Sequence, residues 1–279
     1  MLVRCPAKVN LFLSVGPRDE SGYHPLQTVF QAVGLYDELL VEEAGEDSLT
    51  CDWDGLPAEN TLTKALRLLR ELVPLPPLRL VLTKRIPAES GLGGGSSDAA
   101  GLIRAARKMM SDHCPERFAR EVAAAVGADV PFFLVGGRAK GAGYGEIVEP
   151  LADGDRRWLL IVKPEEGVVT SAAYAALDRG VQARRPTPQS GDLETLGMTD
   201  WGDLGLHNDF GQVAPKICRE LSEKLLALGA DGSLLCGSGS AVFGVFGSES
   251  DAVRAQGKMQ PERSWIAPTL TREESLWTS

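Results

Sequence analysis

The alternation of apolar and polar residues predicts that the chain opens with two strands. Residues 2–15 alternate with the period of two that is typical of a strand. The apolar positions of one face are Val9, Leu11, Leu13 and Val15, and the polar positions of the other are Lys8, Asn10 and Ser14. A turn over residues 18–22 leads to a second strand-like run, residues 26–33.

Helical periodicity follows this pair of strands. Asn60 or Thr61 is suited to cap a helix with the buried face Leu62, Ala65, Leu66, Leu69 and Leu72. Residues 78–83 have a strand-like composition. A helix capped by Ser96 or Ser97 comes next, with the buried face Ala99, Leu102, Ile103, Ala106 and Met110. A further helix covers residues 117–126 and ends at Gly127, a residue suited to a C-terminal cap.

The periodicity breaks over residues 149–155, and we expect a domain boundary there, with domains 1–152 and 153–279. The pattern beyond it predicts a strand at 158–163, a short helix after Thr170, a loop at 179–192, a helix at 211–228, two strands around 237–240, a helix at 249–258 and a last strand near Trp265. Strands and helices mix without strict alternation, which favours an α+β fold in two lobes.

The most informative segment is residues 91–100, GLGGGSSDAA, between the third predicted strand and a helix. Glycines let backbone N–H groups approach a large anion, and a helix N-terminus adds free donors and a positive dipole end. The segment lacks the Lys-Ser/Thr of a P-loop and has Ser96 where a dinucleotide-binding loop needs glycine. A flexible linker is the alternative, but linkers seldom lead directly into a helix. The segment therefore predicts a phosphate site of another kind.

Composition narrows the class of protein. The chain of 279 residues is 43% hydrophobic, enough for one large or two modest cores. A net charge of −9 argues against a nucleic-acid partner. Five scattered cysteines and three histidines show neither a disulfide framework nor metal-ligand spacing. With no signal peptide and no membrane-length apolar run, we expect a cytoplasmic protein without a membrane partner.

Three more segments combine polar and apolar residues in a way that suits chemistry. Lys8 and Asn10 share one strand face, although a lysine there commonly extends to solvent. Asp129 lies in the apolar segment GADVPFF, where Pro131 is expected to keep Val130 extended; a hydrogen-bonded turn aspartate is the alternative. Residues 236–243, CGSGSAVF, form a second glycine turn, which an ordinary hairpin would also explain.

These segments, in this order, resemble the GHMP kinase superfamily, which includes galactokinase, homoserine kinase and mevalonate kinase. The resemblance narrows to a branch that acts in isoprenoid precursor biosynthesis. The segments that carry it are PAKVNL (6–11), GYHPLQTVF (22–30), the glycine loop and LHNDF (206–210). The chain departs from the family pattern at Ser21, where an acidic residue is expected, and at Glu89 and Ser90, where small residues are commoner.

The resemblance implies an N-terminal lobe like ribosomal protein S5, a ferredoxin-like C-terminal lobe and an active site between them. It implies an enzyme that uses ATP and Mg²⁺ and phosphorylates a tertiary hydroxyl of a small molecule carrying a cytidine diphosphate. The chain would act as a monomer or homodimer. The residues implied to bind ATP are Pro87, Glu89, Ser90, Gly91, Leu92, Gly93, Gly94, Gly95, Ser96 and Ser97. Those implied to bind the acceptor are Asn10, Tyr23, His24, Thr170 and Tyr174, with an ordinary helix-face tyrosine as the alternative for Tyr174.

The resemblance assigns the chemistry to two residues. Asp129 would take the proton of the acceptor hydroxyl, and Lys8 would keep Asp129 ionised and stabilise the developing alkoxide. The adenosine contacts are placed around residues 60–64. A homoserine or mevalonate kinase-like activity is one alternative, against which the segment at Tyr23 and His24 argues. A catalytically silent nucleotide-binding sensor is another, and such a protein would be expected to lose Lys8 or Asp129.

Overall fold

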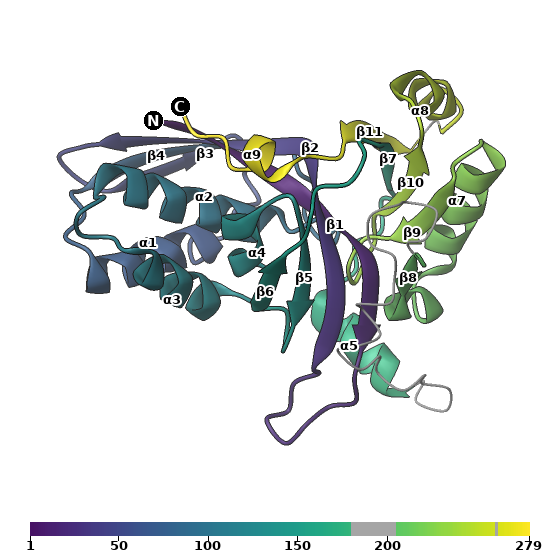
Figure 1. Ribbon diagram of the computed structural model, residues 1–279, viewed down its shortest axis with the longest axis horizontal. Coiled ribbons are helices and arrows are strands. Elements are labelled where there is room, and N and C mark those ends of the chain that lie inside the picture. The colour runs from purple at the N-terminus through teal and green to yellow at the C-terminus, as the bar shows by residue number, and fades with distance from the viewer. Residues whose placement is uncertain (180–204, 260–261) are drawn as a thin grey trace.

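The chain folds into two lobes, each built on one β-sheet (Figure 1). The computed structural model describes residues 1–179, 205–259 and 262–279. The first sheet comprises β1 (Leu2–Val15), β2 (Leu26–Glu43), β3 (Ser48–Cys51), β4 (Leu78–Thr83), β5 (Arg138–Ala142), β6 (Ile147–Pro150) and β8 (His207–Asn208). The second comprises β7 (Trp158–Lys163), β9 (Gly232–Leu235), β10 (Val242–Phe246) and β11 (Arg263–Pro268). Together with the helices, these sheets confirm the predicted α+β class.

The helices that the periodicity predicts start and end close to the expected positions, with one exception. They are α1 (Thr61–Leu72), α2 (Gly94–Met109), α3 (Glu116–Val126), α5 (Thr170–Arg179), α7 (Lys216–Ala227) and α8 (Glu249–Gln256). The structure adds two short helices, α4 (Val130–Val135) and α9 (Arg272–Ser275), and the 3₁₀ helix η2 (Asp209–Gln212). Asn60 caps α1 as predicted, accepting from the amides of Leu62 and Thr63. The helix predicted over 211–228 instead begins after Pro215, which disfavours helical backbone at the residue before it.

The long strand β1 is the central element of the molecule. It pairs antiparallel with β2 along most of its length and parallel with β8 near its end. Its predicted alternation holds through Leu11 and then breaks, because the register with β2 shifts between Asn10 and Phe12. Val9 and Leu11 consequently face the second sheet, whereas Leu13 and Val15 pack in a separate cluster with residues of α7 and α8.

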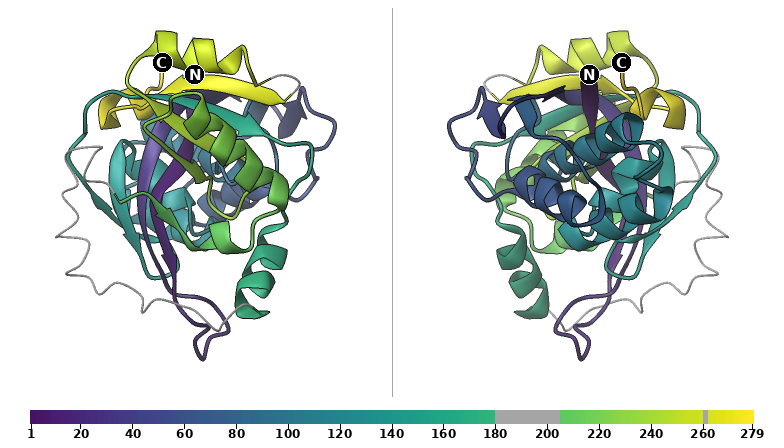
Figure 2. Two further views of the ribbon diagram at one scale, coloured as in Figure 1. Left: turned by 90° about the vertical axis from the view of Figure 1, so that its right-hand side faces the viewer. Right: turned by 90° about the vertical axis from the view of Figure 1, so that its left-hand side faces the viewer.

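Helices α1 to α4 cover the other face of the first sheet and enclose the largest hydrophobic core (Figures 1 and 2). Leu62 and Leu69 of α1 and Leu102 and Ile103 of α2 are fully buried there, as their periodicity predicts. Gly101 of α2 allows this packing, because a Cβ at that position would stand 2.5 Å from the Sγ of Cys5 on β1. The core holds α2, and with it the glycine loop, against β1.

The second sheet has the strand order β11-β7-β10-β9, and all of its pairs are antiparallel. Numbered by chain position among these four, the order is that of a ferredoxin-like sheet. Leu159 and Ile161 pack toward β1, while Leu160 and Val162 pack in the cluster of α7 and α8. Because both faces are covered, β7 is apolar without alternation. Figure 2 shows α7 and α8 over the outer face of this sheet.

The two chain ends lie side by side on the first lobe (Figure 1). The amide of Ser279 donates to the carbonyl of Leu2 at 3.0 Å, and Val3 forms a β-bridge with Thr278. The C-terminal segment therefore returns to the lobe in which the chain starts. The division of the chain after residue 152 stays a prediction, and most of the loop predicted at 179–192 lies outside the described residues. In the parts of the chain that the structure describes, every helix is too short or too polar to cross a membrane.

Candidate active site

The glycine loop runs from the end of β4 to the start of α2 and rests against the second glycine turn. Gly91 has a φ of +77°, and a Cβ on it would stand 1.8 Å from the carbonyl oxygen of Cys236. The amide of Ala241 donates to the carbonyl of Ser90 at 3.2 Å. The two glycine segments, far apart in the sequence, thus meet at one wall of a cleft, and only glycine fits at position 91.

Helix α2 begins two residues earlier than its predicted caps. Gly93, with a φ of +75°, occupies the N-cap position, and no side chain caps the helix. The predicted capping by Ser96 or Ser97 is therefore wrong, because both residues lie in the first turn and the Ser97 amide already donates to the Gly93 carbonyl at 2.9 Å. A glycine N-cap leaves first-turn amides without side-chain partners. Such amides, at the positive end of the helix dipole, suit an anion.

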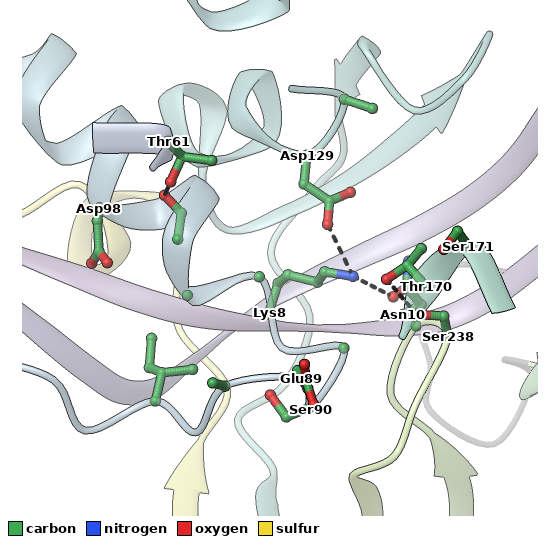
Figure 3. A pocket seen from close by; sticks show the side chains of 18 of the residues that line it. Lys8, Asn10, Thr61, Glu89, Ser90, Asp98, Asp129, Thr170, Ser171 and Ser238 are labelled. Atoms are coloured by element: carbon green, nitrogen blue, oxygen red, sulfur yellow. Dashed lines mark hydrogen bonds and ion pairs between the residues drawn. The ribbon is translucent and has the colours of Figure 1, made fainter. Parts of the chain in front are cut away.

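Lys8 lies at the centre of the cleft, between the glycine loop and Asp129 (Figure 3). Its Nζ is 3.3 Å from Oδ2 of Asp129 and donates to Oδ1 of Asn10 at 2.8 Å. Its side chain is 5% exposed, so the ammonium is held by these partners instead of extending to solvent. The backbone amide of Lys8 donates to the Leu92 carbonyl at 3.0 Å, which fixes the loop to β1.

Asp129 occupies the turn between α3 and α4. Its backbone is near-helical, with φ −81° and ψ −16°, and α4 begins directly after it at Val130. The predicted extended backbone at Val130 is wrong, because Pro131 lies in the first turn of α4, where its missing N–H has no helical partner to lose. The turn leaves the Asp129 side chain 34% exposed and directed at Lys8, as Figure 3 shows.

The predicted base-binding residues lie beyond Asn10, near the loop between β1 and β2. The His24 ring stacks on the Tyr174 ring with centroids 5.1 Å apart, and its Nε2 lies 3.4 Å from Oδ2 of Asp178. Burial raises the pKa of Tyr174 to about 12, so this phenol stays neutral. Tyr23, in contrast, is 67% exposed at the edge of the cleft. An exposed aromatic face beside buried ones can take a flat ring between them.

The segment LHNDF (206–210) contacts both the second glycine turn and the aromatic residues of this region. Asn208 donates through Nδ2 to the carbonyls of Leu235 and Gly237, at 2.9 and 2.8 Å, and so holds the second glycine turn. Phe210 packs edge-on against Tyr174, with centroids 4.9 Å apart. One short segment therefore places both a turn of the cleft wall and the aromatic wall of the predicted base pocket.

Two hydroxyl contacts join elements around the cleft. Oγ1 of Thr61, at the start of α1, donates to the Gly95 carbonyl at 2.6 Å, which brings the ends of α1 and α2 together. Oγ1 of Thr170, at the start of α5, lies 3.1 Å from Oγ of Ser238 in the second glycine turn. The region predicted to bind adenosine thus adjoins the glycine loop, whereas Thr170 lies on the opposite side with Asn10 (Figure 3).

The cleft has a volume of about 930 Å³. The predicted site residues that line it are Lys8, Asn10, Tyr23, His24, Pro87, Glu89, Ser90, Gly91, Gly93, Gly94, Gly95, Asp129, Thr170 and Tyr174. Leu92, Ser96 and Ser97 do not line it: Leu92 and Ser97 are fully buried, and Ser96 is half-buried. Leu92 packs in the core beneath the loop, and Ser96 and Ser97 lie within α2, so the cleft is bordered here mainly by the glycines.

The cleft is also lined by residues that the sequence did not indicate, and Trp53, Lys84 and Asp98 are among them. Lys84 and Asp98 form an ion pair of 2.7 Å, and Lys84 also pairs with the buried Asp37 of β2. The one available signal was Asp98, a charged residue at a buried position of the α2 pattern. Trp53 and Lys84 lie in loop and strand-end positions that are indistinguishable in sequence from ordinary surface residues.

Comparison with known proteins agrees with this geometry. Residues 60–137 match the family model of the GHMP kinases N terminal domain, and residues 206–263 match that of the GHMP kinases C terminal. The chain is 33% identical to a 4-diphosphocytidyl-2-C-methyl-D-erythritol kinase of Geobacter sulfurreducens, covering 97% of this chain and 98% of that one. It is 35% identical to the enzyme of that name from Moorella thermoacetica, covering 91% and 92%. The chain belongs to the 4-diphosphocytidyl-2-C-methyl-D-erythritol kinase family.

This family member is also similar to proteins of known structure. A crystal structure of 4-(cytidine 5'-diphospho)-2C-methyl-D-erythritol kinase is 34% identical, with a TM-score of 0.77 over 96% of this chain and 99% of that one. A homoserine kinase from Cytophaga hutchinsonii shares the fold at 22% identity and a TM-score of 0.69, covering 97% and 94%. The predicted family and fold are therefore confirmed, whereas the role of each site residue stays a prediction.

Proposed function

We propose that this kinase-family member transfers the γ-phosphoryl group of ATP to the tertiary C2 hydroxyl of 4-diphosphocytidyl-2-C-methyl-D-erythritol. The observation that carries the proposal is the pairing of Lys8 with Asp129 directly beside the start of α2. A cation, a carboxylate and a cradle of backbone amides are what phosphoryl transfer to an alcohol requires.

In this mechanism the α2 start and the glycine loop bind the phosphates of ATP through backbone N–H groups. Trp53, Asn60, Thr61 and Leu62 line the cleft beside the loop and form the adenosine side. Thr61 anchors that side to the loop through the Gly95 carbonyl. The cytidine ring of the acceptor lies between Tyr23 and Tyr174, with His24 at its edge, and Asn10 and Thr170 contact the remainder of the acceptor.

The transfer itself uses Asp129 as general base. The carboxylate takes the proton of the C2 hydroxyl, the freed oxygen attacks the γ-phosphorus, and the bond from that phosphorus to the β-phosphate oxygen breaks to release ADP. Lys8 faces the same point and stabilises the negative charge that develops on the attacking and transferring oxygens. Asn10, fixed by its Nδ2 bond to Oγ1 of Thr28 at 2.7 Å, holds the Lys8 ammonium in place.

Mg²⁺ is part of the proposal as the ion that neutralises phosphate charge. Among the described residues, no group of three or more His, Cys, Asp or Glu side chains is placed to hold a metal ion by itself. Glu89 nevertheless offers carboxylate oxygens at the cleft, the ligand type that Mg²⁺ takes alongside substrate phosphates and water. We also propose that the enzyme works in the cytoplasm as a monomer or homodimer, since its five cysteines suit a reducing compartment.

The experiment that tests the function is a coupled ADP-release assay with ATP, Mg²⁺ and a panel of alcohols. The panel holds 4-diphosphocytidyl-2-C-methyl-D-erythritol, homoserine and mevalonate. Turnover with the cytidylyl substrate alone is the expected result. Turnover only with homoserine or mevalonate would keep the Lys8–Asp129 chemistry and remove the proposed base pocket. ATP binding without turnover on any alcohol would instead support the nucleotide-binding sensor.

A further inference from the structure

Three ionisable side chains lie beneath the glycine loop, two of them buried and one half-buried, and the proposed chemistry does not use them. The Nζ of Lys84 donates to Oδ2 of Asp98 at 2.7 Å and to Oδ2 of Asp37. The side chains of Lys84, Asp98 and Asp37 are 12%, 3% and 0% exposed. Removing ionisable groups from water is costly unless they are paired or neutral, so the contacts within this cluster decide which of them carry a charge.

The position of the cluster in the chain connects it to the loop. Lys84 directly follows β4, and Asp98 lies one turn into α2, so their ion pair joins the two ends of the segment that contains the glycine loop. Asp37, in the middle of β2, connects the start of this segment to the sheet. Its Oδ1 accepts from the amides of Arg85 and Ile86, at 2.5 and 2.8 Å. The cluster therefore fixes where the loop starts and where it ends.

The two carboxyl groups are not equivalent. Asp37 receives three N–H donors, from Lys84 and from the amides of Arg85 and Ile86. Asp98 receives one, from Lys84, and its Oδ1 is buried without a hydrogen-bond partner. Hydrogen bonds to the charged form favour ionisation, and burial opposes it. The donors thus favour a charged Asp37 and a neutral Asp98.

The other groups around Asp98 do not supply a compensating charge. On β1, the Cys5 thiol is fully buried, and burial raises its pKa, so it is neutral. On α2, the Arg104 guanidinium donates to the carbonyls of Ser275 and Arg4. Burial, with Asp37 as the second cause, raises the pKa of Asp98 to about 8. The direction of this shift agrees with the count of donors.

We propose that Asp37 and Lys84 form the charged pair that positions the phosphate-binding loop, and that Asp98 completes the cluster as a neutral, protonated acid. This proposal rests on the proposed function, because it assigns the loop to ATP. A neutral Asp98 makes the cluster electrically neutral overall. A Cβ on Gly94 would stand 3.2 Å from the Lys84 Nζ, so the cluster lies directly under the start of α2. A second anion there would repel the phosphates of ATP.

Two isosteric variants separate the carboxyl groups. Asp98→Asn replaces a neutral acid by a neutral amide of the same shape, which still offers a donor group and an acceptor oxygen, so we expect the Kd for ATP within about threefold of that of the native protein. Asp37→Asn leaves the Lys84 ammonium without an ionised partner and directs an NH₂ group at N–H donors. We expect it to raise the Kd and the KM for ATP by about tenfold or more, with the KM for the cytidylyl acceptor within about threefold.

The outcomes are distinguishable. Equal losses of ATP affinity in both variants would overturn the proposal, because Asp98 would then act as an anion. Equal effects of Asp37→Asn on ATP and on the acceptor would also overturn it, since a general loss of structure would explain them. Calorimetric titration of ATP needs no turnover, so this test stands even if the acceptor is wrong. A native protein that binds no ATP would instead refute the proposed function.

A measurement on the native protein covers the case in which Asp37→Asn does not fold. The carboxyl ¹³C shift of Asp98 reports its protonation state directly when it is followed across the pH range, and the Asp98→Asn spectrum assigns the resonance. A protonated Asp98 at neutral pH, beside an ionised Asp37, is the expected result. An ionised Asp98 at neutral pH would overturn the proposal.

Discussion

The sharpest test of the proposed chemistry is Asp129→Asn, which removes the base and keeps the shape. In the native site, Asp129 Oδ2 lies 3.3 Å from the Lys8 ammonium. Two unit charges at that separation attract by about 1 kcal/mol in water and about 5 kcal/mol at an effective dielectric constant of about 20. Asp129 is 34% exposed, so the attraction lies between these limits. The variant loses it, but Lys8 keeps its hydrogen bond to Asn10.

The expected loss of rate follows from the role of the carboxylate. A positioned general base contributes about 10²- to 10⁴-fold, which corresponds to about 2.7–5.5 kcal/mol of activation free energy. We therefore expect kcat to fall by about 10²- to 10⁴-fold in Asp129→Asn. The Kd for ATP should stay within about threefold of that of the native protein, because the glycine loop and α2 are unchanged.

Steady-state ADP release measures kcat and both KM values, and calorimetry measures ATP binding. The matched control is Asp112→Asn, which makes the same charge change at an exposed residue outside the cleft. A kcat for Asp129→Asn equal to that of the control would refute the role of Asp129 as the base.

Three further predictions concern the base pocket, the loop and acid stability. Tyr23→Ala should weaken binding of the cytidylyl acceptor by about 1–3 kcal/mol and leave the KM for ATP unchanged in the same assay; a change confined to ATP would contradict its place in the base pocket. Gly91→Ala places a Cβ 1.8 Å from the Cys236 carbonyl, so we expect lower stability in urea unfolding and a higher KM for ATP; native values would contradict the close approach. Burial alone would raise the pKa of Asp209, but hydrogen bonds from His207 and Val15 outweigh it and hold the pKa below the ordinary value. Asp209 therefore stabilises the fold above its unfolded-state pKa of about 3.9, and this contribution is lost as the pH falls through the lower folded-state pKa. In that acidic range, the free energy of unfolding in urea should depend less on pH for Asp209→Asn than for the native protein.

Much of the site follows from local features of the sequence. The glycine loop is recognisable because an anion site needs backbone without side chains followed by a helix start, and both are encoded within ten residues. Asn60 is recognisable as a cap for the same reason, since capping joins residues that are close in the chain. Neither Lys8 nor Asp129 can be identified as a catalytic residue from its local sequence. Without the structure, only the resemblance to a family pattern pairs the two residues.

Other features depend on contacts between distant residues and could not be derived from the pattern. The shift in register at Asn10 moves Leu13 and Val15 into another cluster, and it arises from the pairing of β1 with β2. The close approach of Gly91 to the Cys236 carbonyl joins two segments that are far apart in the chain, and no local propensity expresses it.

The sequence by itself determined the α+β class and the glycine loop, because periodicity, turn chemistry and glycine spacing act over a few residues. Only the tertiary structure decided that Lys8 is buried against Asp129 and Asn10, and that Lys84 joins Asp37 to Asp98. The local sequence around a charged residue does not indicate whether its side chain is buried in the folded protein. Its environment is set when strands and helices far apart in the chain pack together and exclude water, and its ion pairs follow from that packing.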